Sequence, residues 1–247
     1  MNASNDNRTV RIAMWSGPRN LSTAMMRSFG ARADCAVWDE PFYAPYLKAT
    51  GLDHPMRDEV LAAHETDPAA VARACAGPAP GGEPLFYQKH MTHHMVDGLD
   101  LAWVDAVRSA FLIRDPALVA ASYEVKREKP TLSDLGVERQ AELFDRAADR
   151  LGHAPPVVDS ARITAAPEDA LTALCNALEI PFDPAMLSWP AGRRPEDGVW
   201  AAHWYGAVEN STGFAPARTA EPLMTDHAKR LAERARPYYE RLAKHAL

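Results

Sequence analysis

Charged and polar side chains follow four of the strands that we predict, each close to the point where the strand ends. Arg19 follows the first, Glu40 the second, Lys89 and His90 the third, and Arg114 the fourth. In a parallel sheet the carboxyl ends of the strands share one edge, where ligands of α/β proteins bind. Two arginines with a carboxylate and an imidazole at one edge predict an anion site beside a proton-transfer site.

The segment after the first strand has the composition of an anion-binding loop. The first N–H groups of a helix are unpaired, and the helix dipole favours negative charge there. Arg19 adds a guanidinium that can fork onto two oxygens, and Ser22 and Thr23 add hydroxyl donors. The loop lacks the GK[ST] of a Walker A sequence. A helix capped after a core strand is the alternative. The predicted binding residues are Gly17, Pro18, Arg19, Asn20, Leu21, Ser22 and Thr23.

A second anion anchor is predicted after the fourth strand. Arg114 ends the strand, Pro116 suits the first turn of a helix, and Ser122 lies eight residues after the arginine. About two turns of helix separate the strand end from Ser122, so both side chains can reach one phosphate. The alternative is an arginine paired with an acidic neighbour, such as Asp115.

The two anchors resemble the phosphate-binding motifs of the sulfotransferase superfamily, and the resemblance covers about residues 10 to 185. It implies a P-loop-like fold and the donor 3′-phosphoadenosine-5′-phosphosulfate, with adenosine 3′,5′-bisphosphate as product. The first loop would hold the 5′-phosphosulfate, and Arg114 and Ser122 the 3′-phosphate. Asn20 stands for a serine of the family loop, and Leu21 stands where glycine is usual.

Sulfuryl transfer resembles phosphoryl transfer, so it needs cations around the moving group and a base for the acceptor's proton. Glu40 resembles the glutamate base of carbohydrate-type sulfotransferases. Lys89 and His90 resemble the lysine–histidine element of the cytosolic enzymes, one residue shortened. Both bases stay open, with Glu40 preferred and Asp39 a competitor beside it. Arg19 is expected to stabilise the transferring group.

Two further clusters invite a functional reading. His90, His93 and His94 suggest a metal, but Met91 stands where a zinc hydrolase needs glutamate, so we expect none. His93 and His94 are expected in packing or in a substrate pocket. The later segment contains basic and aromatic residues that could close the donor pocket, with an aromatic cap packed over the sheet as the alternative; they include Arg193, Arg194, Trp200, Trp204, Tyr205 and Phe214.

The elements that must position these residues alternate along the chain. Apolar runs predict strands over 10–15, 35–38, 85–88, 110–113 and 156–159. Helical patterns cover 21–29, 55–76 with breaks, 117–126, 135–151, 167–178 and 223–245. The alternation predicts a three-layer α/β fold with a mostly parallel sheet. We expect one domain, with a core over 8–180, an irregular cap over 181–222 and a closing helix over 223–247.

Composition limits the classes of function. The 247 residues carry a net charge of −6, without the basic stripe of a nucleic-acid binder. No apolar run approaches the roughly 20 residues of a membrane helix, and the polar start indicates a cytoplasmic protein. Three distant cysteines suggest no disulfide framework. We expect a small-molecule acceptor that the sequence does not identify; a homodimer stays open. A P-loop kinase of a small metabolite and a non-catalytic nucleotide-binding protein are the alternatives.

Overall fold

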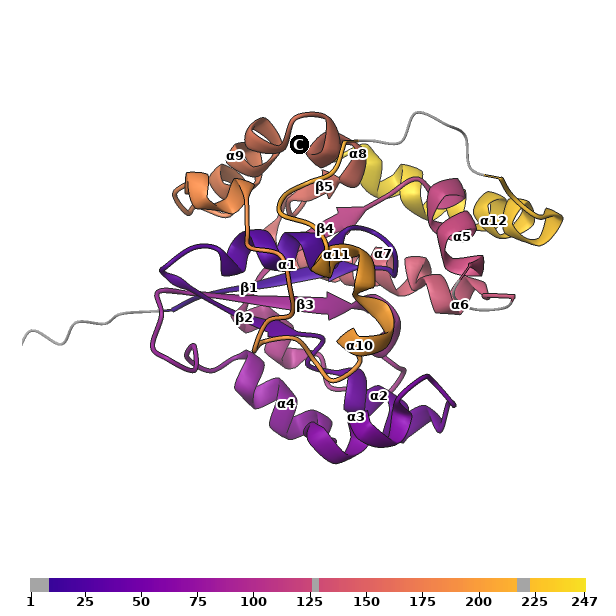
Figure 1. Cartoon of the computed structure of the whole chain (residues 1–247), viewed down its shortest axis with the longest axis horizontal. Coiled ribbons are helices and arrows are strands. Elements are labelled where there is room, and N and C mark those ends of the chain that lie inside the picture. Colours follow the sequence, from indigo (N-terminus) through magenta and orange to yellow (C-terminus); the bar gives the residue numbers. More distant parts are fainter. Residues whose placement is uncertain (1–8, 126–128, 217–222) are drawn as a thin grey trace, which may run out of the picture.

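In a computed structural model that describes residues 9–125, 129–216 and 223–247, the chain folds around one parallel sheet (Figure 1). Five strands pair in the order β2-β3-β1-β4-β5. They are β1 (Val10–Ser16), β2 (Cys35–Asp39), β3 (Leu85–Met91), β4 (Arg108–Ile113) and β5 (Val157–Asp159). All the pairings are parallel, so the carboxyl ends of the strands lie at one edge of the sheet.

Successive side chains of each strand enter two different cores, because a strand alternates its faces with every residue. In β1, Met14 packs in one apolar cluster and Trp15 in the other. In β4, Leu112 joins Met14 and Phe111 joins Trp15. Since both faces are covered, these strands are almost continuously apolar, as buried parallel strands are.

Helices cover both faces of the sheet, which gives the three layers expected from the sequence. Residues of α1 (Ser22–Gly30), α2 (Tyr43–Thr50), α8 (Ser160–Ala165) and α9 (Pro167–Ala177) contribute to the core that contains Met14. Residues of α4 (Pro68–Cys75), α7 (Val137–Leu151) and α12 (Asp226–Ala243) contribute to the core that contains Trp15. Outside the cap the structure also contains α3 (Arg57–Ala63), α5 (Pro116–Glu124) and α6 (Leu132–Leu135), with the 3₁₀ turns η1 (Thr92–His94) and η2 (Ala102–Ala106). No helix of the described ranges combines the length and apolarity needed to cross a bilayer.

The predicted cap contains only short elements: η3 (Pro184–Leu187), α10 (Ala201–Trp204) and α11 (Gly206–Glu209). In Figure 1 α10 and α11, coloured orange, lie across the sheet beside α1 and β3. Contacts far apart in the chain hold this segment. The hydroxyl of Ser28 in α1 donates to the carbonyl of Met186 at 2.7 Å, and the amide of Trp189 donates to the carbonyl of Thr212 at 3.1 Å.

The predicted strands and helices are confirmed in place, with one consequential difference. β3 runs three residues past the predicted end, to Met91, so Lys89 and His90 belong to the strand rather than to a loop. The predicted helix over 55–76 is two helices, α3 and α4. Outside the cap, α2, α6 and α8 were not predicted. Residue 8 of the predicted core, the end of the helix predicted over 117–126 and residues 217–222 of the cap lie outside the described residues. The single-domain division stays a prediction.

Candidate active site

A cavity of about 320 Å³ opens at the carboxyl ends of the strands, on the side that the cap covers. Its walls come from the loop after β1, from Glu40 after β2, from Lys89 near the end of β3 and from Arg114 after β4. The cap adds Tyr205 and other apolar or aromatic side chains: Trp204, Val208 and Phe214. Of the five polar residues predicted at this edge of the sheet, Arg19, Glu40, Lys89 and Arg114 therefore meet at one cavity.

The loop after β1 turns sharply enough to direct its backbone at the cavity. Arg19 and Leu21 take left-handed backbone angles, with φ of 63° and 67°. Glycine is the usual residue in the left-handed region of backbone angles. This is a physical reason for the glycine that the sulfotransferase superfamily loop has at the position of Leu21. Gly17 is required by space, because a Cβ there would lie 2.4 Å from the carbonyl oxygen of Leu135.

The helix that follows this loop begins without a side-chain cap. The side chain of Leu21 makes no hydrogen bond to the first turn of α1, and the hydroxyl-bearing residues Ser22 and Thr23 line the cavity. No capping side chain therefore occupies the position in front of the first N–H groups of α1. Asn20 is held below the loop, where its Nδ2 donates to the carbonyl of Leu112 at 3.3 Å.

The two predicted arginines come together. Arg114 Nη1 donates to the backbone carbonyl of Arg19 at 2.6 Å, and Arg19 Nε donates to Ser122 Oγ at 3.0 Å. Both guanidinium side chains line the cavity, and burial lowers the pKa of Arg19. Ser122 thus contacts Arg19 rather than Arg114, and it lies behind the wall of the cavity while its neighbour Tyr123 lines it. This edge of the cavity carries concentrated positive charge, as an anion site requires.

Glu40 and Lys89 form the centre of a buried polar network beside the arginines. Lys89 Nζ is 2.8 Å from Asp39 Oδ1 and 2.6 Å from the hydroxyl of Tyr205, and it also contacts Glu40 Oε1. Burial raises the pKa of Glu40, and the charge of Lys89 opposes that rise. Burial acts to lower the pKa of Lys89, but Asp39 and Glu40 outweigh it and the pKa is raised. Glu40 therefore combines a raised pKa with a place at the wall of the cavity, which are the two properties that a general base needs.

His90 does not lie where a catalytic base must lie. Lys89 and His90 are consecutive residues of β3, so their side chains leave opposite faces of the sheet. The ring of His90 stacks on Trp15 at 4.6 Å, and its Nε2 is 3.1 Å from Gln88 Oε1. It is 1% exposed, and burial lowers its pKa to about 3. The structure therefore separates His90 from the cavity, and we withdraw it as a candidate base.

His93 and His94 line the cavity instead, beside aromatic side chains. The ring of His94 stacks on Tyr43 at 4.7 Å, and Tyr43 OH is 3.0 Å from Nδ1 of His54. Burial lowers the pKa of His94 well below its ordinary value, so the imidazole is neutral. Among the described residues no group of three His, Cys, Asp or Glu side chains is arranged to hold a metal ion.

Arg193 and Arg194 are not brought to the cavity. Arg194 donates from Nη2 to the carbonyl of Pro190 at 2.8 Å and lines a separate surface depression with Trp189. Arg193 is exposed. The local turn explains this placement, because Asp197 accepts from the backbone N–H of Arg194 at 2.8 Å and holds the basic segment against α1. The prediction that these arginines touch the donor is not supported by their position.

Several residues at the site were not expected: Tyr43, His54 and Tyr123 line the cavity. Tyr205 was expected only as an aromatic of the cap, whereas it belongs to the buried network. Asp39 was expected only as a competing base, whereas it is 3% exposed and bonded to Lys89. A carboxylate at the end of one strand and a lysine at the end of its neighbour were the only sequence signals for this pair.

Two arginines at a cavity beside the start of a helix are an arrangement that suits an anionic ligand. A model of the family described as the sulfotransferase domain matches residues 10–246, nearly the whole chain. The chain belongs to the sulfotransferase domain family, which confirms the resemblance seen in the sequence. Family and fold support a transferase.

Solved sulfotransferase structures have the same fold as this chain. The sulfotransferase domain from the curacin biosynthetic pathway aligns with a TM-score of 0.53 and 15% identity, over 92% of this chain and 97% of its own. A sulfotransferase from Alicyclobacillus acidocaldarius aligns with a TM-score of 0.52 and 14% identity, over 96% of this chain and 95% of its own. These likenesses show the fold.

Two Arabidopsis thaliana proteins match at the level of sequence. They are described as branched-chain-amino-acid aminotransferase-like proteins 1 and 2, and they are 39% and 36% identical over 235 residues. The match covers 95% of this chain but 42% and 41% of theirs. The chain therefore spans about two fifths of the length of these curated relatives.

Proposed function

We propose that this protein moves a sulfuryl group from 3′-phosphoadenosine-5′-phosphosulfate to a hydroxyl or amine of a small-molecule acceptor. The observation that carries the proposal is the meeting of Arg19 and Arg114 at one cavity, with Glu40 on the same wall. The donor, when bound, supplies the sulfuryl group. A cytoplasmic location stays a prediction, and the scheme assigns no role to a metal ion.

The chemistry of the cavity fits this donor. Two guanidinium groups, the open start of α1 and the hydroxyls of Ser22 and Thr23 together offer more anion-binding groups than a single phosphate needs. In the proposal Arg19 and the start of α1 hold the 5′ end of the donor. Arg114 holds the 3′-phosphate, and Ser122 supports Arg19 through its hydrogen bond.

The residues on the acceptor side divide the remaining tasks. Glu40 takes the proton of the acceptor, because it is a carboxylate at the cavity wall, only 11% exposed, with a raised pKa. Arg19 stabilises charge on the transferring group, and loss of such a preorganised donor commonly costs ~10²–10³ in rate. The aromatic and apolar side chains of the cap exclude water from the reacting groups, which strengthens both effects.

A thermal-shift titration with adenosine 3′,5′-bisphosphate tests the proposed donor class. At a ligand concentration of roughly 100 times Kd, binding to the folded state adds about 2.7 kcal/mol of stability. We expect this stabilisation in the parent protein and its loss in Arg114→Ala. Adenosine 5′-monophosphate, which lacks the 3′-phosphate, should stabilise the parent less.

Arg108→Ala is the matched control, because Arg108 opens the same strand at its opposite end and donates to the carbonyl of Leu178. The control variant should keep the full response to adenosine 3′,5′-bisphosphate. A parent that shows no shift, or an Arg114→Ala variant that keeps it, would contradict the proposal. Magnesium-dependent turnover of ATP would select the kinase alternative instead.

A further inference from the structure

The ammonium group of Lys89 has no hydrogen left for a substrate. A protonated lysine carries three N–H donors and no acceptor. The three go to Asp39 Oδ1, to the hydroxyl of Tyr205 and to Glu40 Oε1. The side chain is 1% exposed, so water cannot substitute for these partners. Lys89 therefore acts on the chemistry through Glu40 and not by direct contact with the transferred group.

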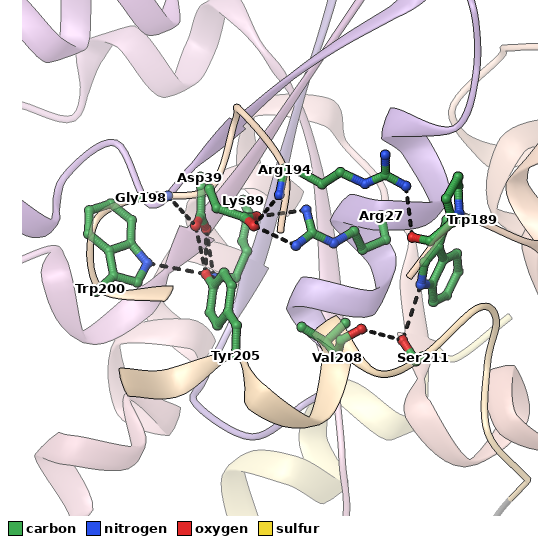
Figure 2. Close-up of polar contacts among 12 residues, drawn as sticks. Arg27, Asp39, Lys89, Trp189, Arg194, Gly198, Trp200, Tyr205, Val208 and Ser211 are labelled. Atoms are coloured by element: carbon green, nitrogen blue, oxygen red, sulfur yellow. Dashed lines mark hydrogen bonds and ion pairs between the residues drawn. The ribbon is translucent and has the colours of Figure 1, made fainter. Parts of the chain in front are cut away.

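The hydroxyl of Tyr205 is also surrounded by partners, and the acceptor nearest to its hydrogen is Asp39. Lys89 Nζ donates to this oxygen at 2.6 Å, and Trp200 Nε1 donates to it at 3.2 Å. The single hydroxyl hydrogen then goes to Asp39, whose two oxygens lie 2.8 and 2.7 Å away. The backbone N–H of Gly198 donates to the same carboxylate at 3.2 Å. Figure 2 shows that these donors from the cap converge on Asp39.

Strand pairing brings the charged members of this network together. Asp39, the last residue of β2, is the register partner of Lys89 in β3. Glu40 follows directly with φ of 42°, and its N–H donates to the carbonyl of Lys89 at 3.0 Å. The left-handed turn places the two consecutive carboxylates on the same ammonium group.

The two oxygens of Glu40 have different surroundings. Oε1 contacts Lys89 and lies 3.5 Å from the hydroxyl of Tyr205. Oε2 is 4.0 Å from Nε2 of His94, which is neutral, and Glu40 lines the cavity. One oxygen is therefore held in place while the other is open to a ligand. The titratable groups that face Glu40 from the surrounding elements are Asp39, Tyr43, Lys89, His94 and Tyr205.

We propose that Asp39 and Tyr205 are positioning residues of this site, which hold Lys89 between two carboxylates so that Glu40 stays fixed and basic. The inference rests on the proposed function, in which Glu40 is the base. Asp39 neutralises part of the charge of Lys89 that would otherwise make Glu40 a weaker proton acceptor. The cap supplies Tyr205, Trp200 and Gly198. The hydrogen bonds that hold Asp39, and through it Lys89 and Glu40, therefore form only when the cap lies against β2.

The test is a pH titration of the Glu40 side-chain carboxyl by NMR, in full-length protein labelled with ¹³C at glutamate carboxyls. Glu40→Gln identifies the resonance. In Asp39→Asn a negative charge beside Glu40 is gone, so we expect Glu40 to titrate at lower pH than in the parent. In the Tyr205→Phe variant, Asp39 loses the hydrogen bond that the Tyr205 hydroxyl donates to it. Asp39 then competes more strongly with Glu40 for Lys89, so Glu40 should titrate at higher pH than in the parent.

Shifts of the Glu40 titration in opposite directions in the two variants are a result that a merely structural role would not produce. If either variant only loosened the site, water would enter and Glu40 would move toward its ordinary titration in both. Movement in the same direction, or no movement in either variant, would overturn the proposal. Should Asp39→Asn fail to fold by circular dichroism, the direction seen in Tyr205→Phe decides alone.

Tyr239→Phe is the matched control, because Tyr239 OH donates to Asp159 Oδ2 at 2.7 Å at the end of β5. This variant removes the same kind of bond and should leave the titration of Glu40 unchanged. Binding of adenosine 3′,5′-bisphosphate is measured on the same samples and should persist in all the variants. If the parent did not bind adenosine 3′,5′-bisphosphate, the proposed function would be refuted. The titrations of Glu40 would still test the roles of Asp39 and Tyr205.

Discussion

Removal of the Asp197 carboxylate should destabilise the protein strongly, because it leaves a guanidinium buried without a counter-charge. Arg27 of α1 and Asp197 of the cap form two contacts of 2.6 Å, with side chains 3% and 0% exposed (Figure 2 shows the arginine). Breaking one partner of a buried pair costs about 3–5 kcal/mol. We therefore expect Asp197→Ala to lower the free energy of unfolding by about that amount, a large part of the roughly 5–15 kcal/mol of an ordinary domain.

Urea unfolding followed by tryptophan fluorescence measures this loss, because the cap holds three of the six tryptophans: Trp189, Trp200 and Trp204. Asp97→Ala is the matched control. Asp97 pairs with Arg139 at a fully exposed position, where ion pairs contribute less than about 1 kcal/mol. Similar small losses in both variants would refute the reasoning. The double variant Arg27→Met, Asp197→Leu should recover much of the stability, since no charge is then left buried.

Three more outcomes are expected. Leu21→Gly should raise the free energy of unfolding, measured by thermal denaturation, by up to about 1 kcal/mol. A residue with a side chain costs roughly 1–2 kcal/mol in the left-handed region, and glycine removes this strain but loses more conformational entropy on folding. Gly17→Ala should lower the free energy of unfolding in urea by about 1–3 kcal/mol, because its Cβ would meet the carbonyl of Leu135; an unchanged midpoint would contradict this. Burial lowers the pKa of His90 from 6.5 to about 3, so the unfolded chain binds a proton that the folded chain rejects. Its contribution is complete above pH 6.5 and is lost as the pH falls toward 3, with a slope of at most about 1.4 kcal/mol per pH unit. His90→Gln should flatten that loss of stability, and equal slopes would count against the assignment.

Local patterns carried much of the fold and the anion site. The apolar run that ends in Ser16 and the helical spacing from Leu21 to Phe29 are short-range features, so a strand, a tight loop and a helix were predictable without knowledge of distant contacts. The order of alternating strands and helices then required a parallel sheet. Since parallel strands end at a common edge, Arg19 and Arg114 were expected to be neighbours although 95 residues separate them.

The acid–base site depended on features that no local pattern contains. Whether Lys89 or His90 faces the cavity is decided by how far β3 extends, and pairing with β1 and β2 carries the strand past both residues. Arg194 is held away from the cavity by a turn around Asp197, although its charge suggested a donor contact. Tyr205 reaches Lys89 across 116 residues of chain, through a cap whose path depends on contacts with α1 and β2.

Sequence therefore determined the strands, the loop and the arginine pair because these follow from neighbouring residues. Only the tertiary structure decided which carboxylate lies at the wall of the cavity, because burial and charge at Glu40 come from residues distant in the chain.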